Sequence, residues 1–446
     1  MKFDQARFYV LEKAKARGAN VEVYAITRSS TGVKAFEGEV SEFKLSKQMG
    51  LSIRALVNQA WGYSFTENFS ETALDRALEM ALQNAELVEP VTHAVIGAWA
   101  EPPHVGDLYG EGLSGVTVDR KVQLALTLER AIRDADPRVK SVPYGGYSDG
   151  EIQTALANTA GLKRSYKQNF AFQYAMPLVS ENGQNKSDME FQFSREFEQL
   201  DPTRTALEAV RKSLAMLGGK PAPSGIYPVV IDRDCLATFL GTFARIFSAK
   251  QVHDGKSPLA GKLETQIGSS VVTLLDDATR TAGMQSRPFD DEGFPSQKLV
   301  LLEHGVLKTF MHNTETAAKD GIPSTGHGSR YGYRGTVGVA PSNFYLEPGT
   351  GTQNDLMADI SQGVLLTHIH GQHAGANPIN GDFSLQADGF WIENGKVAHP
   401  LEVFTVAGNF LELLANIEVV ADDLKFSPGG IGGASVRVSS LNIGGQ

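Results

Sequence analysis

Two segments in the second half of the chain each carry the sequence of a β-hairpin. One spans residues 286–313 (SRPFDDEGFPSQKLVLLEHGVLKTFMHN) and the other spans residues 380–409 (NGDFSLQADGFWIENGKVAHPLEVFTVAGN). In each, an apolar strand is followed by a Glu, a His-Gly or Asn-Gly pair and a returning strand, which is the local signal of a type I′ turn. Short strands and Gly-rich turns continue to the final VRVSSLNIGG. This half of the chain is therefore predicted to be mainly β, with a closed or sandwich-like architecture.

The first half of the chain combines strands with helices. Runs of apolar and β-branched residues separated by Gly or polar turns predict a meander of strands at residues 21–28, 32–40, 50–58 and 60–66. Apolar residues at helical spacing predict helices at the N-terminus, from about residue 70, at 118–134 and at 202–217. Residues 145–197 alternate between polar and apolar, which favours antiparallel pairing. The fold class is thus α+β, with an N-terminal antiparallel sheet flanked by helices.

One segment is a natural junction between the two halves. Residues 218–225 (GGKPAPSG) combine glycines and prolines with small polar residues, a composition typical of linkers. We place a boundary there, giving an N-terminal α+β domain at residues 1–220 and a C-terminal β-rich domain at 221–446.

Composition narrows the class of protein. The net charge of −10 gives no basic field that would hold the chain on DNA or RNA, so no direct nucleic-acid contact is expected. No run approaches the roughly 18 apolar residues of a membrane span, and the N-terminus lacks the apolar core of a signal peptide. We therefore expect a cytoplasmic protein without membrane contact. The single cysteine, Cys235, excludes an internal disulfide and multi-cysteine metal sites, and its apolar helical neighbours place it in a core.

Several catalytic motifs are missing from the sequence. It contains no H-E-x-x-H or H-E-x-x-x-H, the spacings that put two zinc ligands and a general base on one helix. It also contains no G-x-S-x-G nucleophile elbow, and its Gly-rich loops do not follow the phosphate-binding spacing. Neither a zinc peptidase helix, nor a serine hydrolase, nor a nucleotide-binding loop is indicated.

A series of segments, in order along nearly the whole chain, resembles the TldD/PmbA family, also described as the modulator of DNA gyrase family. The segments are GLSIRALVNQAWGYSFT, SPLAGKL, LLDD, SRPFDDEG, the EHG hairpin, STGHGSR, GDFSLQADGFWIENG and GNFLELLANIEVVADDL. The resemblance implies a metallopeptidase system in which a TldD-like subunit holds zinc and a TldE-like subunit pairs with it to process peptides. The word gyrase in this family description refers to a biological effect, and the resemblance does not imply a reaction on DNA.

The zinc motif of the TldD branch has no counterpart in this chain. Counting back from SPLAGKL, Leu240 stands where the first His of H-E-x-x-x-H would be, Gly241 where the Glu would be and Arg245 where the second His would be. The Cys that this branch carries near the C-terminus is also missing, since the sequence there runs SPGGIGG. The chain is therefore similar to the PmbA/TldE-like branch, which implies that it binds no metal or other cofactor itself and that zinc resides in a TldD-like partner.

Three histidines lie within six residues, at His368, His370 and His373. On a strand, His368 and His370 would project from one face, and a turn at Gly371 could bring His373 near them, which is a workable metal site. The alternative is a polar strand end that lines a cleft, with the imidazoles hydrogen-bonded to backbone or solvent. The family pattern carries no metal here, and we favour the second interpretation.

The segment around Arg287, Asp290 and Asp291 is a candidate for substrate binding. Two carboxylates could serve acid–base chemistry or attract a peptide amino terminus. The simpler interpretation, which we favour, is a turn in which aspartate caps free backbone N–H groups and Arg287 balances the charge, because adjacent carboxylates point apart. We interpret Asp276 and Asp277 in the same way.

Arg330 and Arg334, which alternate with tyrosines, are expected in a substrate loop or subunit contact.

Three functions remain open from the sequence. The first is a metal-free TldE-like subunit that forms a heterodimer with a zinc-bearing TldD-like subunit and binds peptide along an edge strand. The second is an autonomous metallopeptidase that uses His368, His370 and His373. The third is a homodimeric peptide-binding protein without catalysis. Catalytic residues in the chain itself, the substrate and the partner are not specified by the sequence.

Overall fold

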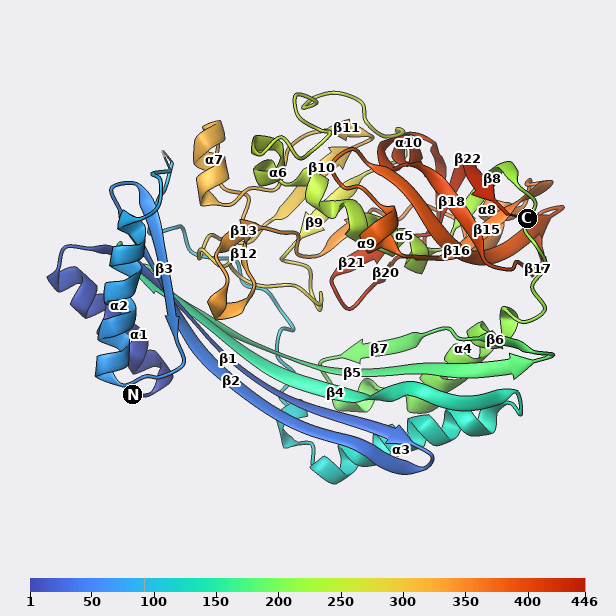
Figure 1. Cartoon of the computed structure of the whole chain (residues 1–446), viewed down its shortest axis with the longest axis horizontal. Helices are drawn as coiled ribbons and strands as arrows, with labels where there is room; N and C mark the ends of the chain where they lie inside the picture. The colour runs from blue at the N-terminus through green and yellow to red at the C-terminus, as the bar shows by residue number, and fades with distance from the viewer. Residues whose placement is uncertain (92, 446) are drawn as a thin grey trace.

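The computed structural model describes residues 1–91 and 93–445, and these residues form the predicted α+β fold. A long, curved antiparallel sheet makes up the N-terminal half, and the C-terminal half lies on the inside of its curve (Figure 1). The strand order is β3-β2-β1-β4-β5-β6, with β7 also paired to β5. The strands are β1 (Asn20–Phe36), β2 (Glu39–Val57), β3 (Ala60–Thr66), β4 (Val139–Asn158), β5 (Lys163–Glu181), β6 (Gln184–Lys186) and β7 (Glu190–Ser194).

The predicted strands at 21–28 and 32–40 are wrong in their bounds. Residues 20–36 form one continuous strand, β1, and the turn to β2 lies at Glu37 and Gly38, whose φ angles are 53° and 82°. Gly32 does not interrupt β1, because it pairs with Lys44 of β2 on one side and Ser148 of β4 on the other. Ladder partners on both sides keep these small polar residues extended.

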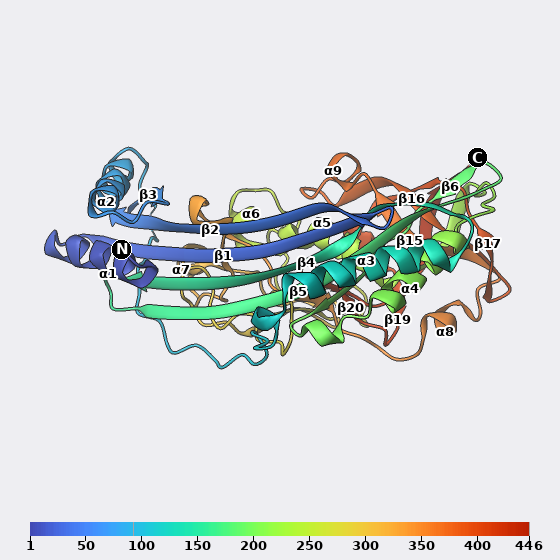
Figure 2. The ribbon, with the colours of Figure 1, turned by 90° about the horizontal axis from the view of Figure 1, so that it is seen from below.

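Side chains on the long sheet alternate between its two faces, as strand geometry requires. Val21, Val23 and Ala25 of β1 pack on α1 and α2, and Val33 packs on α3, so the helices cover the outer face (Figure 2). These helices lie where the sequence predicts them, and the Ser70 hydroxyl caps α2 by accepting a hydrogen bond from the Ala73 N–H at 3.3 Å. The helices are α1 (Phe3–Ala16), α2 (Glu71–Glu86), α3 (Val118–Ala135) and α4 (Pro202–Ala215).

The C-terminal half contains a closed five-stranded barrel, which confirms the closed form of the predicted β architecture. Its strands follow the order β15-β8-β22-β18-β16, and β16 pairs back to β15 to close the ring. The strands of this sheet are β8 (Gly225–Ile231), β15 (Gln362–His370), β16 (Asp382–Glu393), β17 (Lys396–Pro400), β18 (Phe404–Asn409), β19 (Ile417–Val420) and β22 (Val436–Gly444). The predicted boundary near residue 220 falls between α4 and β8, and the division into two domains stays a prediction.

A second C-terminal sheet has the order β11-β10-β9-β14-β21-β20, and β12 and β13 form a separate pair. These strands are β9 (Leu274–Asp277), β10 (Lys298–Glu303), β11 (Val306–Leu307), β12 (Gly328–Arg330), β13 (Val337–Val339), β14 (Phe344–Leu346), β20 (Lys425–Phe426) and β21 (Ile431–Gly433). The helices are α5 (Arg233–Phe243), α6 (Ala249–His253), α7 (Thr314–Asp320), α8 (Gln353–Met357), α9 (Gln372–Gly375) and α10 (Phe410–Ala415). Cys235 of α5 is buried in the C-terminal core, as its apolar neighbours predict.

Both predicted hairpins are confirmed. The first joins β10 to β11 through His304 and Gly305, and the second joins β16 to β17 through Asn394 and Gly395. All four turn residues have positive φ, between 48° and 80°, as a type I′ turn requires. The two hairpins belong to different sheets. Among the described residues, no helix is long and apolar enough to cross a membrane.

Candidate functional site

The inner face of the long sheet meets the SRPFDDEG segment of the C-terminal half. The side chains of β1 that alternate with its helix-facing residues point this way, and Tyr24 and Ile26 pack with Phe289 in one apolar cluster. Phe289 is 2% exposed, so the segment is anchored in the sheet. Gly293, with φ at +75°, passes so close to Leu162 that an added Cβ would lie 2.4 Å from its Cδ2 atom. The following loop is therefore held against the sheet by a close approach that only glycine permits.

Asp290 organises the turn that follows Phe289. Its Oδ1 atom accepts hydrogen bonds from the N–H groups of Glu292 and Phe294, both at 2.9 Å, and Oδ2 accepts one from Gly328 N–H at 2.7 Å. Burial, with the nearby Glu292 carboxylate, raises the pKa of Asp290. The interpretation of this aspartate as a cap of backbone N–H groups is confirmed, and all of its close contacts are to the chain itself.

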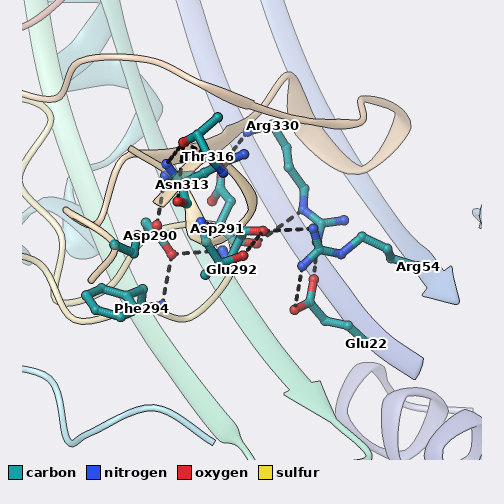
Figure 3. Close-up of polar contacts among 12 residues, drawn as sticks. Glu22, Arg54, Asp290, Asp291, Glu292, Phe294, Asn313, Thr316 and Arg330 are labelled. Atoms are coloured by element: carbon teal, nitrogen blue, oxygen red, sulfur yellow. Dashed lines mark hydrogen bonds and ion pairs between the residues drawn. The ribbon is translucent and has the colours of Figure 1, made fainter. Parts of the chain in front are cut away.

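Glu292 links the C-terminal half to the long sheet (Figure 3). Its Oε1 atom accepts a hydrogen bond from Arg54 Nη1 of β2 at 2.8 Å and another from the Thr314 hydroxyl at 2.8 Å. Its Oε2 atom accepts from Thr314 N–H at 2.7 Å, at the start of α7. Arg54 also donates to Glu22 Oε2 of β1 at 3.1 Å. The side chains of Glu22, Arg54 and Glu292 are all at least 97% buried.

Arg330 closes this network from the other side. Its side chain is fully buried, is paired with Glu22 through Nη2 and lies over the Tyr24 ring, 5.0 Å from the ring centre. Its backbone N–H donates to Asp291 Oδ2 at 2.7 Å, and its Nε donates to the Asp291 carbonyl at 3.2 Å. Asp290, Asp291 and Glu292 thus accept hydrogen bonds from three different sets of partners. Their carboxylates accept hydrogen bonds from the chain itself, and Glu292 lies near enough to Asp290 to raise its pKa.

The network holds three carboxylates, Glu22, Asp291 and Glu292, against two guanidinium groups, Arg54 and Arg330. Burial lowers the pKa of Arg54, but Glu22 and Glu292 raise it more, so the pKa of Arg54 lies above its usual value and the side chain stays charged. Buried ion pairs add little net stability compared with apolar packing, but removing one partner is expensive because it strands the other charge. The network therefore fixes how the two halves of the chain meet.

A cavity of about 420 Å³, which we call the sheet cavity, opens beside this network. Its wall includes Tyr24 and Tyr166 of the long sheet, Arg195, and Arg287, Asp291 and Arg330 of the C-terminal half. The Nη1 atom of Arg287 lies 4.0 Å from Asp291 Oδ2, so Arg287 balances the negative charge of Asp291, as predicted, but without a close hydrogen bond. Two of the three candidate substrate-binding residues of this segment, Arg287 and Asp291, line this cavity, whereas the third, Asp290, is fully buried and is not part of its wall.

Asp276 and Asp277 also act within the chain. Asp276 is fully buried and accepts hydrogen bonds from Ser342 N–H at 2.7 Å and from the Ser342 hydroxyl, and its Oδ1 lies 3.1 Å from His327 Nε2. Asp277 caps the following turn by accepting from Thr279 N–H at 2.8 Å. The interpretation of this pair as turn and backbone caps is confirmed for Asp277, while Asp276 joins a buried polar cluster.

The histidines lie elsewhere, at the end of β15. His368 and His370 project from one face of the strand, as predicted, with ring centres 6.2 Å apart and ring planes 11° from parallel. Each is paired with an aspartate, His368 with Asp188 at 3.2 Å and His370 with Asp388 at 2.8 Å. Burial lowers the pKa of His368, but the hydrogen bond to Asp188 and the negative charges of Asp188, Asp388 and Asp232 together raise it more, so its pKa lies above the usual value.

His373 follows on α9 and is exposed, and it is absent from the described contacts of His368 and His370. His368 and Asp188 line a second cavity of about 470 Å³ between α4 and the barrel. Within residues 1–91 and 93–445, no group of three or more His, Cys, Asp or Glu side chains is placed to hold a metal ion. The arrangement is that of a polar strand end beside a cleft.

The positions that correspond to the family zinc motif do not fit zinc. Leu240 is fully buried in the apolar core around α5, Gly241 has no side chain, and Arg245 is exposed on the short 3₁₀ helix after α5. Zinc requires neutral imidazole, thiolate or carboxylate donors, and none of these three residues provides one. No catalytic step of this chain can be derived through zinc at this helix.

Two residues of the buried network, Glu22 and Arg54, were not candidates from the sequence. Each is a single charge inside an apolar run, Glu22 in VEVYAI and Arg54 in LSIRAL. A charge at an alternating strand position usually faces solvent, so this pattern signals a buried pair only when both faces of the sheet are known to be covered. Arg330 was a candidate for a substrate loop or subunit contact, but its burial was not expected, because Tyr331 beside it is 98% exposed while the Arg330 side chain is buried.

Comparison with known proteins agrees with this architecture. Family models for the first, central and C-terminal domains of PmbA/TldA metallopeptidases match residues 21–85, 111–217 and 224–445. The chain belongs to the PmbA/TldD metallopeptidase family. A crystal structure from Thermotoga maritima, described as a candidate modulator of a DNA gyrase, is 31% identical, covers 99% of this chain and all of the other, and superposes with a TM-score of 0.92.

More distant members of the PmbA/TldD family span nearly the same length. The metalloprotease PmbA homolog of Haemophilus influenzae is 27% identical over 99% of this chain and 96% of its own. The metalloprotease TldD homolog of the same organism is 25% identical over 92% of this chain and 89% of its own. The structure of TldE from Thermococcus kodakarensis is 23% identical, with a TM-score of 0.88 and 99% of this chain covered, which shows a shared fold.

Proposed function

We propose that this chain is the metal-free, TldE-like subunit of a cytoplasmic metallopeptidase, and that it pairs with a zinc-bearing TldD-like subunit to degrade or process peptides. The observation that carries this proposal is the set of residues at the zinc-motif positions. Leu240, Gly241 and Arg245 cannot ligate zinc or activate water, while segments of the family surrounding the sheet cavity are present in the chain.

The free edge of the long sheet supports pairing with another chain. β3 pairs with β2 only over residues 51–57, so in the described structure residues 39–49 of β2 have no strand on their outer side. Exposed apolar side chains lie along this stretch, including Phe43 at 43% and Leu45 at 66% exposure. A long apolar edge is an aggregation hazard unless a partner covers it. A subunit seated there would remove the hazard.

In this proposal the two subunits divide the work. This chain supplies one wall of the cleft and binds extended peptide by edge-strand hydrogen bonds, as an added strand. The partner supplies zinc, the activated water and the general base. The autonomous metallopeptidase gains no support from the histidines, because His368 and His370 contact different aspartates and no cluster of three metal ligands forms among the described residues.

The test is reconstitution of the purified chain with a TldD-like subunit from the same organism. We expect the mixture to elute as a complex in size-exclusion chromatography and to hydrolyse an unstructured peptide in a zinc-dependent manner, with this chain inactive alone. Zinc-dependent turnover by this chain alone, lost on changing His368 and His370 to Ala, would refute the proposal. A stable homodimer that binds peptide and ignores the TldD-like subunit would instead establish a non-catalytic binding protein.

A further inference from the structure

The sheet cavity has an excess of positive charge in an acidic protein. The cationic residues that reach its wall are Arg28, Arg195, Arg287 and Arg330, and Asp291 is the one carboxylate among the lining residues. The chain as a whole carries a net charge of −10. A basic concavity on an acidic protein concentrates anions, because low-dielectric walls focus the local field.

Two of these arginines already have their partners. Arg330 is paired with Glu22. Arg195 donates to the carbonyl oxygens of Leu108, at 2.9 Å, and of Gly283, at 3.0 Å, which ties its side chain to two loops. Arg195 gives three hydrogen bonds to carbonyl oxygens through its Nη atoms, although its Nε has no acceptor among the described residues. Arg28 and Arg287 are therefore the cations of the cavity whose Nη groups are least engaged with the chain.

Arg287 has unused hydrogen-bonding capacity. Its guanidinium carries five N–H donors. One donates a long hydrogen bond of 3.5 Å to the Gly328 carbonyl, and Nε is buried without an acceptor in the described structure. Asp291 lies 4.0 Å from Nη1 of Arg287, beyond hydrogen-bond distance, and the Oδ2 of Asp291 accepts instead from Arg330 N–H at 2.7 Å. A guanidinium with free donors in a shielded site is suited to a two-point contact with a carboxylate.

Much of the remaining wall is aromatic, beside aliphatic residues such as Ile26 and Ile152 and polar ones such as Thr154 and Gln168. Tyr24, Tyr166, Phe170, Phe172 and Phe193 line the cavity from the long sheet and β7. Its volume of about 420 Å³ lies within the range of about 300–1,000 Å³ typical of small-ligand sites. The cavity therefore combines one anion-binding group with a surface that accepts a large apolar or aromatic side chain.

A third cavity, of about 510 Å³, adjoins the sheet cavity and shares Ile26, Arg28 and Arg330 with it. Its wall continues to Tyr331 and Arg334 at the surface. Arg28 is exposed and stands where the two cavities meet. A chain that ends at Arg287 can thus extend past Arg28 toward solvent.

We propose that the sheet cavity binds the C-terminal carboxylate of a peptide whose last side chain is aromatic or large and apolar. Arg287 holds the carboxylate, the aromatic wall holds the last side chain, and Arg28 adds positive charge where the peptide leaves. A monoanion fits better than a phosphate dianion, because Asp291 beside Arg287 repels added negative charge. This inference rests on the proposed function, since it assumes that the ligand is a peptide.

The experiment compares two fluorescent peptides that end in Leu-Phe and differ only in carrying a C-terminal carboxylate or a C-terminal amide. Binding is measured by fluorescence anisotropy on this chain alone and on its complex with the zinc-bearing subunit from which zinc has been removed. We expect the acid to bind about tenfold or more tightly than the amide, the size expected for a charge-assisted contact. Arg287→Gln should abolish this preference.

Two further variants separate this effect from loss of folding. Arg28→Gln removes an exposed side chain at the cavity mouth and should reduce the preference for the acid by a few-fold. Arg17→Gln removes an exposed arginine on the far side of the sheet, paired with Glu79 at 2.7 Å, and should leave the preference unchanged. Circular dichroism checks that each variant is folded.

Equal binding of acid and amide, or a preference that survives both Arg287→Gln and Arg28→Gln, would overturn the inference. An amidated peptide with an internal Glu that competes as well as the free acid would overturn the assignment to the C-terminus. Either result leaves the proposed function standing if the active complex still hydrolyses longer peptides. Failure of the complex to hydrolyse any peptide would contradict the proposed function itself.

Discussion

Replacing Arg54 with Met tests whether the buried ion network holds the two halves of the chain together. Arg54 lies between Glu22 at 3.1 Å and Glu292 at 2.8 Å, and both carboxylates are 1% exposed. Met keeps much of the side-chain length that packs against the Trp61 ring, over which the Arg54 guanidinium lies at 4.1 Å. The substitution therefore removes the charge and its donors with little change in volume.

The expected loss of stability depends on the hydrogen-bond partners that each carboxylate retains in the variant. Glu22 keeps its pairing with Arg330, whereas Glu292 keeps only the N–H and hydroxyl of Thr314. Removing one partner of a buried pair costs about 3–5 kcal/mol, and the remaining bonds place this case near the lower end. We expect Arg54→Met to lower the free energy of unfolding by about 3 kcal/mol at pH 7.

The loss should depend on pH in a definite direction. Without Arg54, the buried Glu292 carboxylate loses its cationic partner, and its negative charge becomes costly. Uptake of a proton removes that charge, so the variant should come closer to wild type as pH falls from 7 toward about 5. Urea denaturation followed by tryptophan fluorescence measures both quantities.

The matched control is Arg17→Met, which breaks the exposed pair with Glu79 and should cost less than about 1 kcal/mol. A loss below about 1 kcal/mol for Arg54→Met, with no dependence on pH, would count against this role for Arg54. It would mean that the halves are held by apolar packing around Phe289 and that the network contributes little.

Three other predictions concern separate parts of the molecule. Gly293→Ala should lower the free energy of unfolding by about 1–3 kcal/mol, because the new Cβ meets Leu162 at a φ of +75°, whereas Gly183→Ala, with φ at +81° and open space, should cost about 1 kcal/mol; equal losses would contradict the close approach. His368→Asn should remove a stabilising contribution that is fully present below pH of about 6.5 and is lost as pH rises through the raised folded-state pKa of His368, so the difference in unfolding free energy from wild type should shrink at alkaline pH; a constant difference would refute the role of Asp188. Leu45→Lys should weaken the complex with a TldD-like subunit in analytical ultracentrifugation without changing the unfolding of this chain, while the same change at Leu207, 52% exposed on α4, should leave the complex intact.

Local signals in the sequence were sufficient for much of the fold. Asn-Gly and His-Gly turns located both hairpins, and the Ser70 cap and the apolar spacing after it located α2. For the C-terminal half, the sequence predicted either a closed or a sandwich-like β architecture and did not distinguish between the two. Closure depends on the pairing of β15 with β16 and of β8 with β15, which is decided by tertiary packing.

The candidate site was predicted less completely, for a physical reason. The capping role of Asp290 is local, because its acceptors serve N–H groups two and four residues on, and the sequence indicated it. Glu22 and Arg54 act across more than 200 residues, on Arg330 and Glu292, and nothing near them in the sequence specifies those partners. The continuous course of β1 through residues 29–31 was missed for the same reason, since its ladder partners lie on other strands.

The zinc content of the reconstituted complex, measured by mass spectrometry together with peptide hydrolysis, decides whether this chain is the metal-free subunit. We expect about one zinc ion per pair of chains and activity in the complex, with neither zinc nor activity in this chain after the same treatment alone. Stoichiometric zinc in this chain alone, with peptide hydrolysis that follows it, would show that it is a metallopeptidase by itself.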